Sequence, residues 1–214
     1  LGFLPKGSYL VGGYIRDIIL KRVTEEVDVD IVVPFNAIEI GKMISENIKS
    51  KFIILDKERE VVRIILNHIS VDISNQISST IEGDLRSRDF SINSVAFLFD
   101  KKLLLDPLNG LKDLQFSLLK TYSEINLLND PLRILRCFRF VSELNFKMDL
   151  KLVEFIKKNK GKLFLVAKER INYEIQKIVN GVNALDAIML IKKINIFGTD
   201  NLYEESFFLD LEKI

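Results

Sequence analysis

The sequence is poor in residues that bind metals through sulfur or imidazole. It contains one cysteine, Cys137, and one histidine, His68, among 214 residues. A single cysteine excludes an internal disulfide bond and fits a reducing compartment, so a cytoplasmic location is expected. One cysteine and one histidine also cannot build a zinc site of the Cys/His type, so any metal must be held by oxygen ligands.

Long apolar runs and an excess of one charge are also lacking. No segment is long and apolar enough to span a membrane, and no signal peptide is recognised. The net charge of +1 gives no indication of a nucleic-acid partner, although basic residues could still cluster locally. With 48% hydrophobic and 29% charged residues, the chain has the composition of a globular protein that can bury a core.

Hydrophobic periodicity changes character near the middle of the chain. The first half predicts strands at residues 8–11, 27–33, 51–55, 61–66, 69–74, 94–99 and 102–106, and helices at residues 14–21 and 35–48. Asn36 is a candidate helix cap, and Asn67-His68 suits a two-residue hairpin turn. From Asp130 onward, helices are expected at residues 131–145, 149–159, 168–180 and 182–195. The pattern predicts an α+β chain with a mixed α/β head over residues 1–120 and a helical segment over 121–214.

Two acids interrupt the strand in "EEVDVDIVV", residues 25–33. Because side chains alternate across a strand, Asp28 and Asp30 share one face while Val27, Val29 and Ile31 share the other. Two ionised carboxylates on Cα atoms roughly 6.6 Å apart repel each other, and a divalent cation such as Mg²⁺ would relieve the repulsion. Two such ions could support a displacement at phosphorus. An edge strand with a solvated outer face would show the same two acids.

Two further features lie close to this strand in the sequence. Asp72 is on the polar face of the strand at residues 69–74, and it would add a third carboxylate if the two strands are neighbours. The Gly12-Gly13 pair precedes a helix that carries Arg16, and such a turn lets phosphate approach the backbone. A Gly-Gly pair alone is also an ordinary tight turn, and the G-x-G-x-x-G spacing of dinucleotide-binding turns is absent.

The arginines after Asp130 recur every three residues, at positions 133, 136 and 139, and therefore form one ridge along a helix. Asp130 precedes Pro131, which suits the first position of a helix. An aspartate supplies acceptors and an arginine supplies donors, so the two could satisfy the Watson–Crick edge of a base. The alternative is a helix with a cationic solvent-exposed face and an ordinary aspartate cap.

Five collinear segments resemble the motifs of one family. They are LVGGYIRD with VDVDIVV, LRSRDFSINSVAF, DPLNGLKDLQFSLLKT, NDPLRILRCFRF and KERINYEIQKI. Together they resemble the class II tRNA nucleotidyltransferases and bacterial poly(A) polymerases, which belong to the polymerase-β-like nucleotidyltransferase superfamily. The resemblance implies a nucleotidyltransferase head with a small mixed sheet and flanking helices, followed by an all-α neck. On this resemblance, residues 121–214 would hold the neck and the start of the body, and the tail that follows in the family would lie outside these 214 residues.

The resemblance also implies roles for individual residues. Asp28 and Asp30 match the catalytic carboxylates and would hold Mg²⁺ in a two-metal site, and Asp72 is added to the catalytic residues on its position in the neighbouring strand expected above. Nucleotide binding is expected from ten residues spread over the chain: Gly12, Gly13, Arg16, Arg88, Asp89, Asn93, Asp130, Arg133, Arg136 and Arg139. Within this set, Asp89 would contact the ribose, and Asp130 with Arg133 would read the incoming base. Glu169 and Arg170 would brace the neck helices.

The implied reaction is template-independent addition of CMP, AMP or both, from CTP and ATP, to the 3′ end of tRNA. The RNA 3′-hydroxyl would attack the α-phosphate and release pyrophosphate. Asn129 stands where the family usually has a glutamate that orients the base-reading arginine, so base choice is open. Alternatives are a poly(A) polymerase, an enzyme that adds only C or only A, a nucleotide-binding module without RNA extension, and a nucleotidyltransferase with a non-RNA acceptor.

Overall fold

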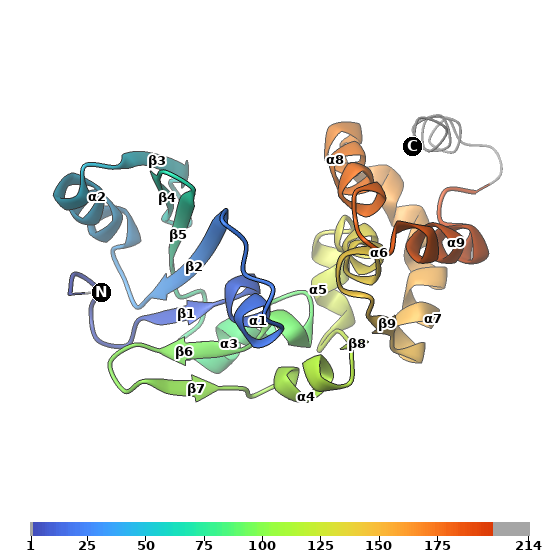
Figure 1. The fold of residues 1–214 in the computed structure, drawn as a ribbon, viewed down its shortest axis with the longest axis horizontal. Coiled ribbons are helices and arrows are strands. Elements are labelled where there is room, and N and C mark those ends of the chain that lie inside the picture. Colours follow the sequence, from blue (N-terminus) through green and yellow to red (C-terminus); the bar gives the residue numbers. More distant parts are fainter. Residues whose placement is uncertain (1, 199–214) are drawn as a thin grey trace. The chain divides into compact units, whose positions relative to one another are not determined.

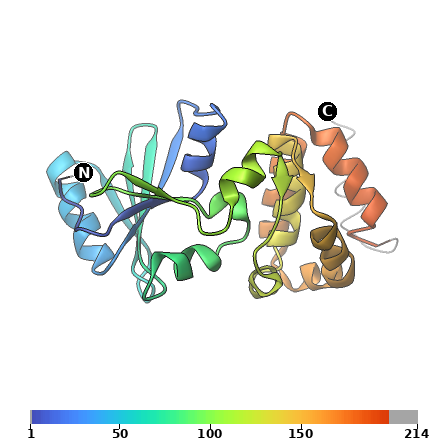
Figure 2. The same ribbon diagram turned by 90° about the horizontal axis from the view of Figure 1, so that it is seen from below.

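The computed structural model describes residues 2–198 (Figures 1 and 2). The chain forms two compact units that divide between Leu114 and Gln115. The last part of the expected helical segment, residues 199–214, lies outside the described residues. Within residues 2–198, no helix is both long and apolar enough to cross a membrane.

The first unit is built on a seven-stranded mixed sheet in the order β3-β4-β5-β2-β1-β6-β7. Its strands are β1 (Tyr9–Val11), β2 (Val27–Val33), β3 (Lys51–Asp56), β4 (Val61–Leu66), β5 (Ile69–Asn75), β6 (Ala96–Leu98) and β7 (Leu103–Leu105). Strand β2 pairs parallel with β5, and the other neighbours in the sheet pair antiparallel. The expected small mixed sheet is therefore confirmed, and the acidic strand lies inside it.

Helices flank this sheet, as Figure 1 shows. They are α1 (Gly13–Ile19), α2 (Ala37–Ile48), α3 (Ile81–Arg86), the 3₁₀ turn η1 (Ser91–Asn93) and α4 (Gly110–Gln115). The sequence predicted α1, α2 and, from the DPLNG segment at residues 106–110, a turn followed by the short helix α4, but it did not predict α3 or η1. Helix α3 is short, and its start is marked by Thr80, whose hydroxyl accepts a hydrogen bond from Gly83 N at 3.2 Å.

Strand β2 is packed on both faces, because its apolar residues contribute to two separate cores. Ile31 and Val33 belong to a buried cluster with residues of α2, β4 and β5. Val32 belongs to a second cluster, with Val11 and Leu85 among its members. An edge strand with a solvated outer face is therefore excluded. The two acids are confined to the first half of one face of a central strand.

The start of α2 corrects one prediction. Asn36 is at the cap position with φ of 56°, but its side chain makes no capping hydrogen bond. Instead, the Ala37 N–H donates to Asn75 Oδ1 at 2.9 Å, so the cap comes from the end of β5. The hairpin predicted at Asn67-His68 is confirmed, since Leu66 of β4 pairs with Ile69 of β5.

The second unit is mainly helical. Its elements are α5 (Glu124–Asn129), α6 (Arg133–Leu144), α7 (Leu150–Asn159), the 3₁₀ turn η2 (Lys160–Leu165), α8 (Lys168–Val179), α9 (Ala184–Ile194) and a small parallel pair, β8 (Leu118–Leu119) with β9 (Lys147–Met148). Helix α6 packs against both α8 and α9. Cys137 lies fully buried in α6 and is a core residue.

The turn between α8 and α9 approaches α6 very closely. Ser142 Oγ donates to the Ile178 carbonyl at 2.5 Å, and the Asn183 N–H donates to the Ser142 carbonyl at 2.9 Å. A Cβ atom on Gly181 would lie 2.9 Å from the Ser142 carbonyl carbon, closer than such contacts occur. Only glycine therefore lets the turn sit on the backbone of α6.

Candidate active site

The two acids of β2 lie beside β5 in the parallel register. Asp28 is opposite Ser70, and Asp30 is opposite Asp72. The Ser70 hydroxyl donates to Asp28 Oδ1. Because β2 and β5 are neighbours, Asp72 lies in the same part of the sheet as Asp28 and Asp30. The sequence alone could not show that these two strands are neighbours.

Asp72 is held by an arginine on the next strand. Arg63 of β4 donates through Nε and Nη2 to the two carboxylate oxygens of Asp72, each at 2.7 Å. A bidentate pair of this kind is a strong and directional interaction. The carboxylate of Asp72 therefore has a fixed orientation, and its charge is balanced by Arg63.

The electrostatic surroundings of Asp30 favour a bound cation. Burial raises the pKa of Asp30 above its usual range, and the nearby charges of Asp72 and Asp28 raise it further, while Arg88 and Arg63 offset part of the increase. A divalent cation on Asp28 and Asp30 would remove this penalty, so the pair fits an ion with oxygen ligands. In the described part of the chain, no group of three or more His, Cys, Asp and Glu residues could hold a metal. Two carboxylate ligands fill only part of the coordination sphere of such an ion, and they would leave positions for water and phosphate oxygens.

We predict that Asp30→Asn stabilises the protein at neutral pH when divalent cations are removed by a chelator. A raised pKa means that the folded state binds the proton of Asp30 more tightly than the unfolded state does, so the ionised carboxylate destabilises the fold at pH 7. This penalty disappears as the pH falls through the raised pKa toward about 4, the value of an unfolded aspartate. The Tm of Asp30→Asn should exceed that of the wild type by a few degrees at pH 7, with a difference that shrinks toward pH 4.

Thermal unfolding measured from pH 4 to pH 7 checks this expectation. The matched control is Asp100→Asn, which removes a charge from the exposed loop between β6 and β7. Adding a divalent cation should raise the Tm of the wild type and leave that of Asp30→Asn almost unchanged. A Tm difference that does not depend on pH would contradict the electrostatic explanation.

Gly12 brings the turn after β1 into contact with this carboxylate. Its φ is +80°, a conformation that L side chains rarely adopt. A Cβ atom at this position would lie 2.5 Å from Asp30 Oδ2 and 3.2 Å from Arg88 Nη1. The Gly12 backbone, the Asp30 carboxylate and the Arg88 guanidinium therefore converge on one point. Arg88 is also 3.6 Å from the buried carboxylate of Asp84.

Arg16 links the helix after the glycine turn to a segment far along the chain. Its Nε and Nη2 atoms donate to the carboxylate of Asp17 at 2.9 and 2.8 Å, and its Nη1 atom donates to Asn93 Oδ1 at 2.9 Å. Asn93 in turn donates to Asp89 Oδ1 at 3.1 Å. Asn93 and Asp89 are both buried. The structure thus brings together Arg16, Asn93 and Asp89, three residues that the sequence predicted as nucleotide ligands. Asn93 contacts Arg16, and Asp89 contacts Asn93.

A cavity of about 270 Å³ opens beside the two acids. Its walls are the start of α1 with Gly13 and Arg16, the start of β2 with Asp28 and Asp30, and the loop from Arg22 to Glu26. The sequence did not single out this loop, because it carries no motif and its path depends on how α1 packs. The only signal was its position between the phosphate-type turn and the acidic strand.

The predicted base-reading residues belong to the second unit, where their side chains are held by neighbours. Asp130 Oδ2 accepts a hydrogen bond from Arg170 Nη2 at 3.0 Å, and Arg133 Nη1 donates to the Asn126 carbonyl at 3.0 Å. The backbone N–H of Arg133 donates to the Asp130 carbonyl at 3.0 Å. Asp130 and Arg133 are therefore adjacent at the start of α6, and Arg170 fixes the aspartate from α8.

The arginine ridge on α6 is largely covered. The side chain of Arg139 is only 12% exposed, and its Nη1 atom donates to Glu174 Oε1 of α8 at 2.9 Å. The guanidinium carbons of Arg136 and Arg139 lie 6.0 and 5.0 Å from the centre of the Phe140 ring. A simple cationic solvent-exposed face is thus excluded, and Arg139 joins α6 to α8.

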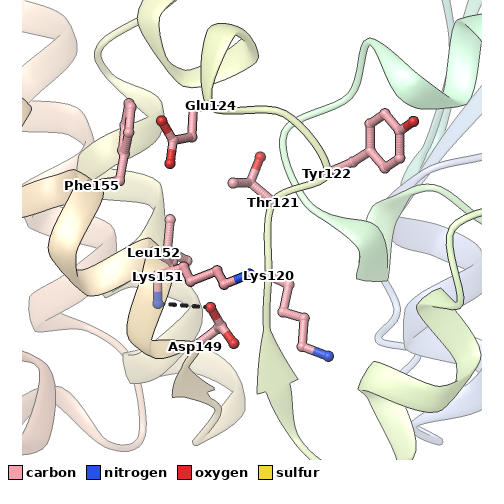
Figure 3. Close-up of a pocket in the computed structure, with 8 residues that line it drawn as sticks. All are labelled: Lys120, Thr121, Tyr122, Glu124, Asp149, Lys151, Leu152 and Phe155. Atoms are coloured by element: carbon pink, nitrogen blue, oxygen red, sulfur yellow. Dashed lines mark hydrogen bonds between the residues drawn. The ribbon is translucent and has the colours of Figure 1, made fainter.

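A second cavity, of about 410 Å³, lies between residues 120–124 and the start of α7 (Figure 3). Lys120 and Lys151 contribute two positive charges to its lining, and Glu124 and Asp149 contribute two negative ones. Asp149 also accepts a hydrogen bond from the Lys151 N–H at 2.9 Å and so caps α7. None of the predicted site residues lines this cavity.

The first part of the chain matches a known protein family. The family model described as the poly(A) polymerase head domain matches residues 8–120, which is more than half of the chain. The chain belongs to this family. The resemblance found in the sequence motifs is thereby confirmed for the head.

Individual relatives are tRNA-processing proteins. The CC-adding tRNA nucleotidyltransferase of Synechocystis is 38% identical over 81% of this chain and 42% of its own length. The A-adding tRNA nucleotidyltransferase of Deinococcus radiodurans is 30% identical over 90% of this chain and 44% of its own length. The Thermotoga maritima CCA-adding enzyme complexed with tRNA has a TM-score of 0.80 and 30% identity, covering 89% of this chain and 47% of that one. The chain thus spans less than half the length of these relatives.

Proposed function

We propose that the chain is the head and neck of a template-independent RNA nucleotidyltransferase that adds nucleotides to the 3′ end of tRNA. The observation that carries this proposal is the convergence of Asp30, Gly12 and Arg88 beside Asp28 on a central strand. Two carboxylates, a close backbone approach and an arginine are the groups that a nucleoside triphosphate and its cation need. The relatives named as tRNA nucleotidyltransferases support the choice of substrate.

The proposed cation is Mg²⁺, held by Asp28 and Asp30, with two ions in the complete site. When bound, it neutralises charge on the phosphates and on the attacking and leaving oxygens. The residues of the chain position the reactants around it. Arg88 lies beside Asp30 and would bind phosphate oxygens, while Asp72, fixed by Arg63, would complete the acidic group.

We assign triphosphate binding to the head at residues 1–120 and base recognition to the helical segment at residues 121–214. Gly12, Gly13 and Arg16 would hold the triphosphate, and Asn93 and Asp89 would set the position of Arg16. Asp130 and Arg133 would read the base. Support for this comes from Arg170, which holds the Asp130 carboxylate as a bracing residue should.

We further propose CTP and ATP as the nucleotides, tRNA as the acceptor and the cytoplasm as the compartment. Solved complexes of CCA-adding enzymes with CTP and with ATP, each 28% identical to this chain, support both nucleotides. The 38% identity with a CC-adding relative favours addition of C. CTP is therefore the first nucleotide to test. The single cysteine fits the proposed compartment.

An extension assay tests the proposal. The 214-residue chain is incubated with Mg²⁺, labelled CTP or ATP, and tRNAs that end before, within or after the C-C-A terminus. We expect CMP to be added to the tRNA that ends before C-C-A and no nucleotide to the completed one. Measurable nucleotide binding without extension of any RNA would instead indicate a binding module. Long runs of AMP on unrelated RNA would indicate a poly(A) polymerase.

A further inference from the structure

One of the arginines around the two acids differs from the others in its surroundings. Arg16 is bound to Asp17 and Asn93, Arg63 is bound to Asp72, and Arg88 lies beside Asp84. Arg22 lines the same cavity as Asp28 and Asp30. Among residues 2–198, its side chain has no hydrogen bond, ion pair or ring contact.

The backbone fixes the place of Arg22 even though the side chain is unpaired. Its N–H donates to the Asp17 carbonyl at 2.8 Å, and the N–H of Lys21 donates to the Ile18 carbonyl at 3.1 Å. Lys21 has φ of 55°, so the chain turns sharply just before Arg22. The loop therefore leaves α1 along a defined path and presents Arg22 at the cavity.

Charge balance in the cavity indicates what Arg22 binds. The positive charge of Arg16 is already matched by Asp17, and Glu26, Asp28 and Asp30 add three negative charges. A nucleoside triphosphate adds several more, of which only part can be met by cations on the two acids. Arg22 is the guanidinium in this cavity whose five donors are available, and a guanidinium fork matches phosphate oxygens.

We propose that Arg22 binds the β- and γ-phosphates of the incoming nucleotide and so determines affinity for the triphosphate without contributing to base choice. This inference rests on the proposed function, because it takes the cavity to be the nucleotide site. It extends the site to the loop at residues 22–26, which the motifs do not cover.

The test compares equilibrium binding of ATP, CTP and AMP to the 214-residue chain in Mg²⁺. For Arg22→Ala, we expect the Kd of ATP and CTP to rise about tenfold and to the same degree, as loss of a charged phosphate contact implies. The Kd of AMP, which lacks the β- and γ-phosphates, should stay within about twofold. Arg22→Lys keeps the charge but lacks the guanidinium fork, so its Kd values for ATP and CTP should lie between those of the wild type and those of Arg22→Ala.

The matched control is Arg59→Ala, which removes the same charge from the turn between β3 and β4. The Arg59 side chain is 84% exposed and does not line the cavity. This variant should bind all three nucleotides as the wild type does. Where extension is measured, Arg22→Ala should raise KM for CTP about tenfold and leave KM for tRNA unchanged.

Three outcomes would overturn the inference. They are unchanged ATP binding by Arg22→Ala, an equal loss of AMP and ATP binding, and a higher KM for tRNA rather than for CTP. Each would leave the proposed function intact as long as the wild type extends tRNA. Failure of the wild-type chain to bind any nucleotide would instead count against the proposed function itself.

Discussion

Replacing either Asp28 or Asp30 with asparagine is expected to reduce nucleotide addition about a thousandfold or more while the fold persists. Asparagine has almost the same shape as aspartate, so the pairing of β2 with β1 and β5 should not change. The substitution removes a negative charge from the pair that would hold the cation, and oxygen-ligated ions depend on that charge. The effect should fall on kcat because the charge is needed most where new charge develops on the phosphate.

Two measurements separate this expectation from a loss of folding. Single-turnover extension of tRNA gives the rate, and the Tm rise caused by a divalent cation reports binding without catalysis. Both signals should be lost in Asp28→Asn and Asp30→Asn and kept in the control Asp100→Asn, whose carboxylate is exposed. Extension within tenfold of the wild type, together with a normal cation response, would refute the assignment of these two acids.

The second large effect is expected at Gly12. Alanine in a backbone conformation with φ of +80° costs about 1–2 kcal/mol, and its Cβ would lie 2.5 Å from Asp30 Oδ2. Either the turn or the carboxylate must move, so Gly12→Ala should lose both stability and most nucleotide addition. We expect the free energy of unfolding to fall by about 2 kcal/mol or more and addition to fall about a hundredfold.

Gly13→Ala is the matched control, since the two glycines are neighbours in the same turn. A Cβ at Gly13 would lie 3.2 Å from Arg16 Nη2, the flexible end of a side chain, and Gly13 has no positive φ. This variant should therefore be milder in denaturant unfolding. If contact with Asp30 causes the effect, Gly12→Ala should destabilise less in an Asp30→Ala background than in the wild type. Equal destabilisation in both backgrounds would rule out that contact as the cause.

Local rules account for much of the acidic part of the site. Alternation along β2 is enough to place Asp28 and Asp30 on one face of the strand. The two-residue turn at Asn67-His68 is a second local feature from which part of the site can be predicted. It sets the register of β4 on β5, and that register places Arg63 opposite Asp72. The ion pair that orients the third carboxylate could therefore have been predicted.

Contacts between distant segments could not be predicted in this way. The hydrogen bond from Arg16 to Asn93 joins residues that are 77 positions apart, and no periodicity reports such a distance. The same limit applies to Arg139, whose spacing predicted a ridge but not a partner in Glu174 of α8. It also applies to Arg22, because the path of a loop depends on the packing of the helix before it. Sequence patterns thus indicate faces and turns, while tertiary packing decides which charges remain available.

The parallel pairing of β2 with β5 has a consequence for how the protein folds. Antiparallel neighbours such as β4 and β5 meet through a two-residue turn, whereas Asp28 and Ser70 are 42 positions apart and must close a long loop. The hairpin of β4 and β5 can therefore form early, and its docking onto β2 comes later. Until that docking occurs, Asp72 is already paired with Arg63 but Asp30 is still remote from both. Asp72 thus joins Asp28 and Asp30 only as the central strands pair, so the complete group of three carboxylates marks a nearly complete fold.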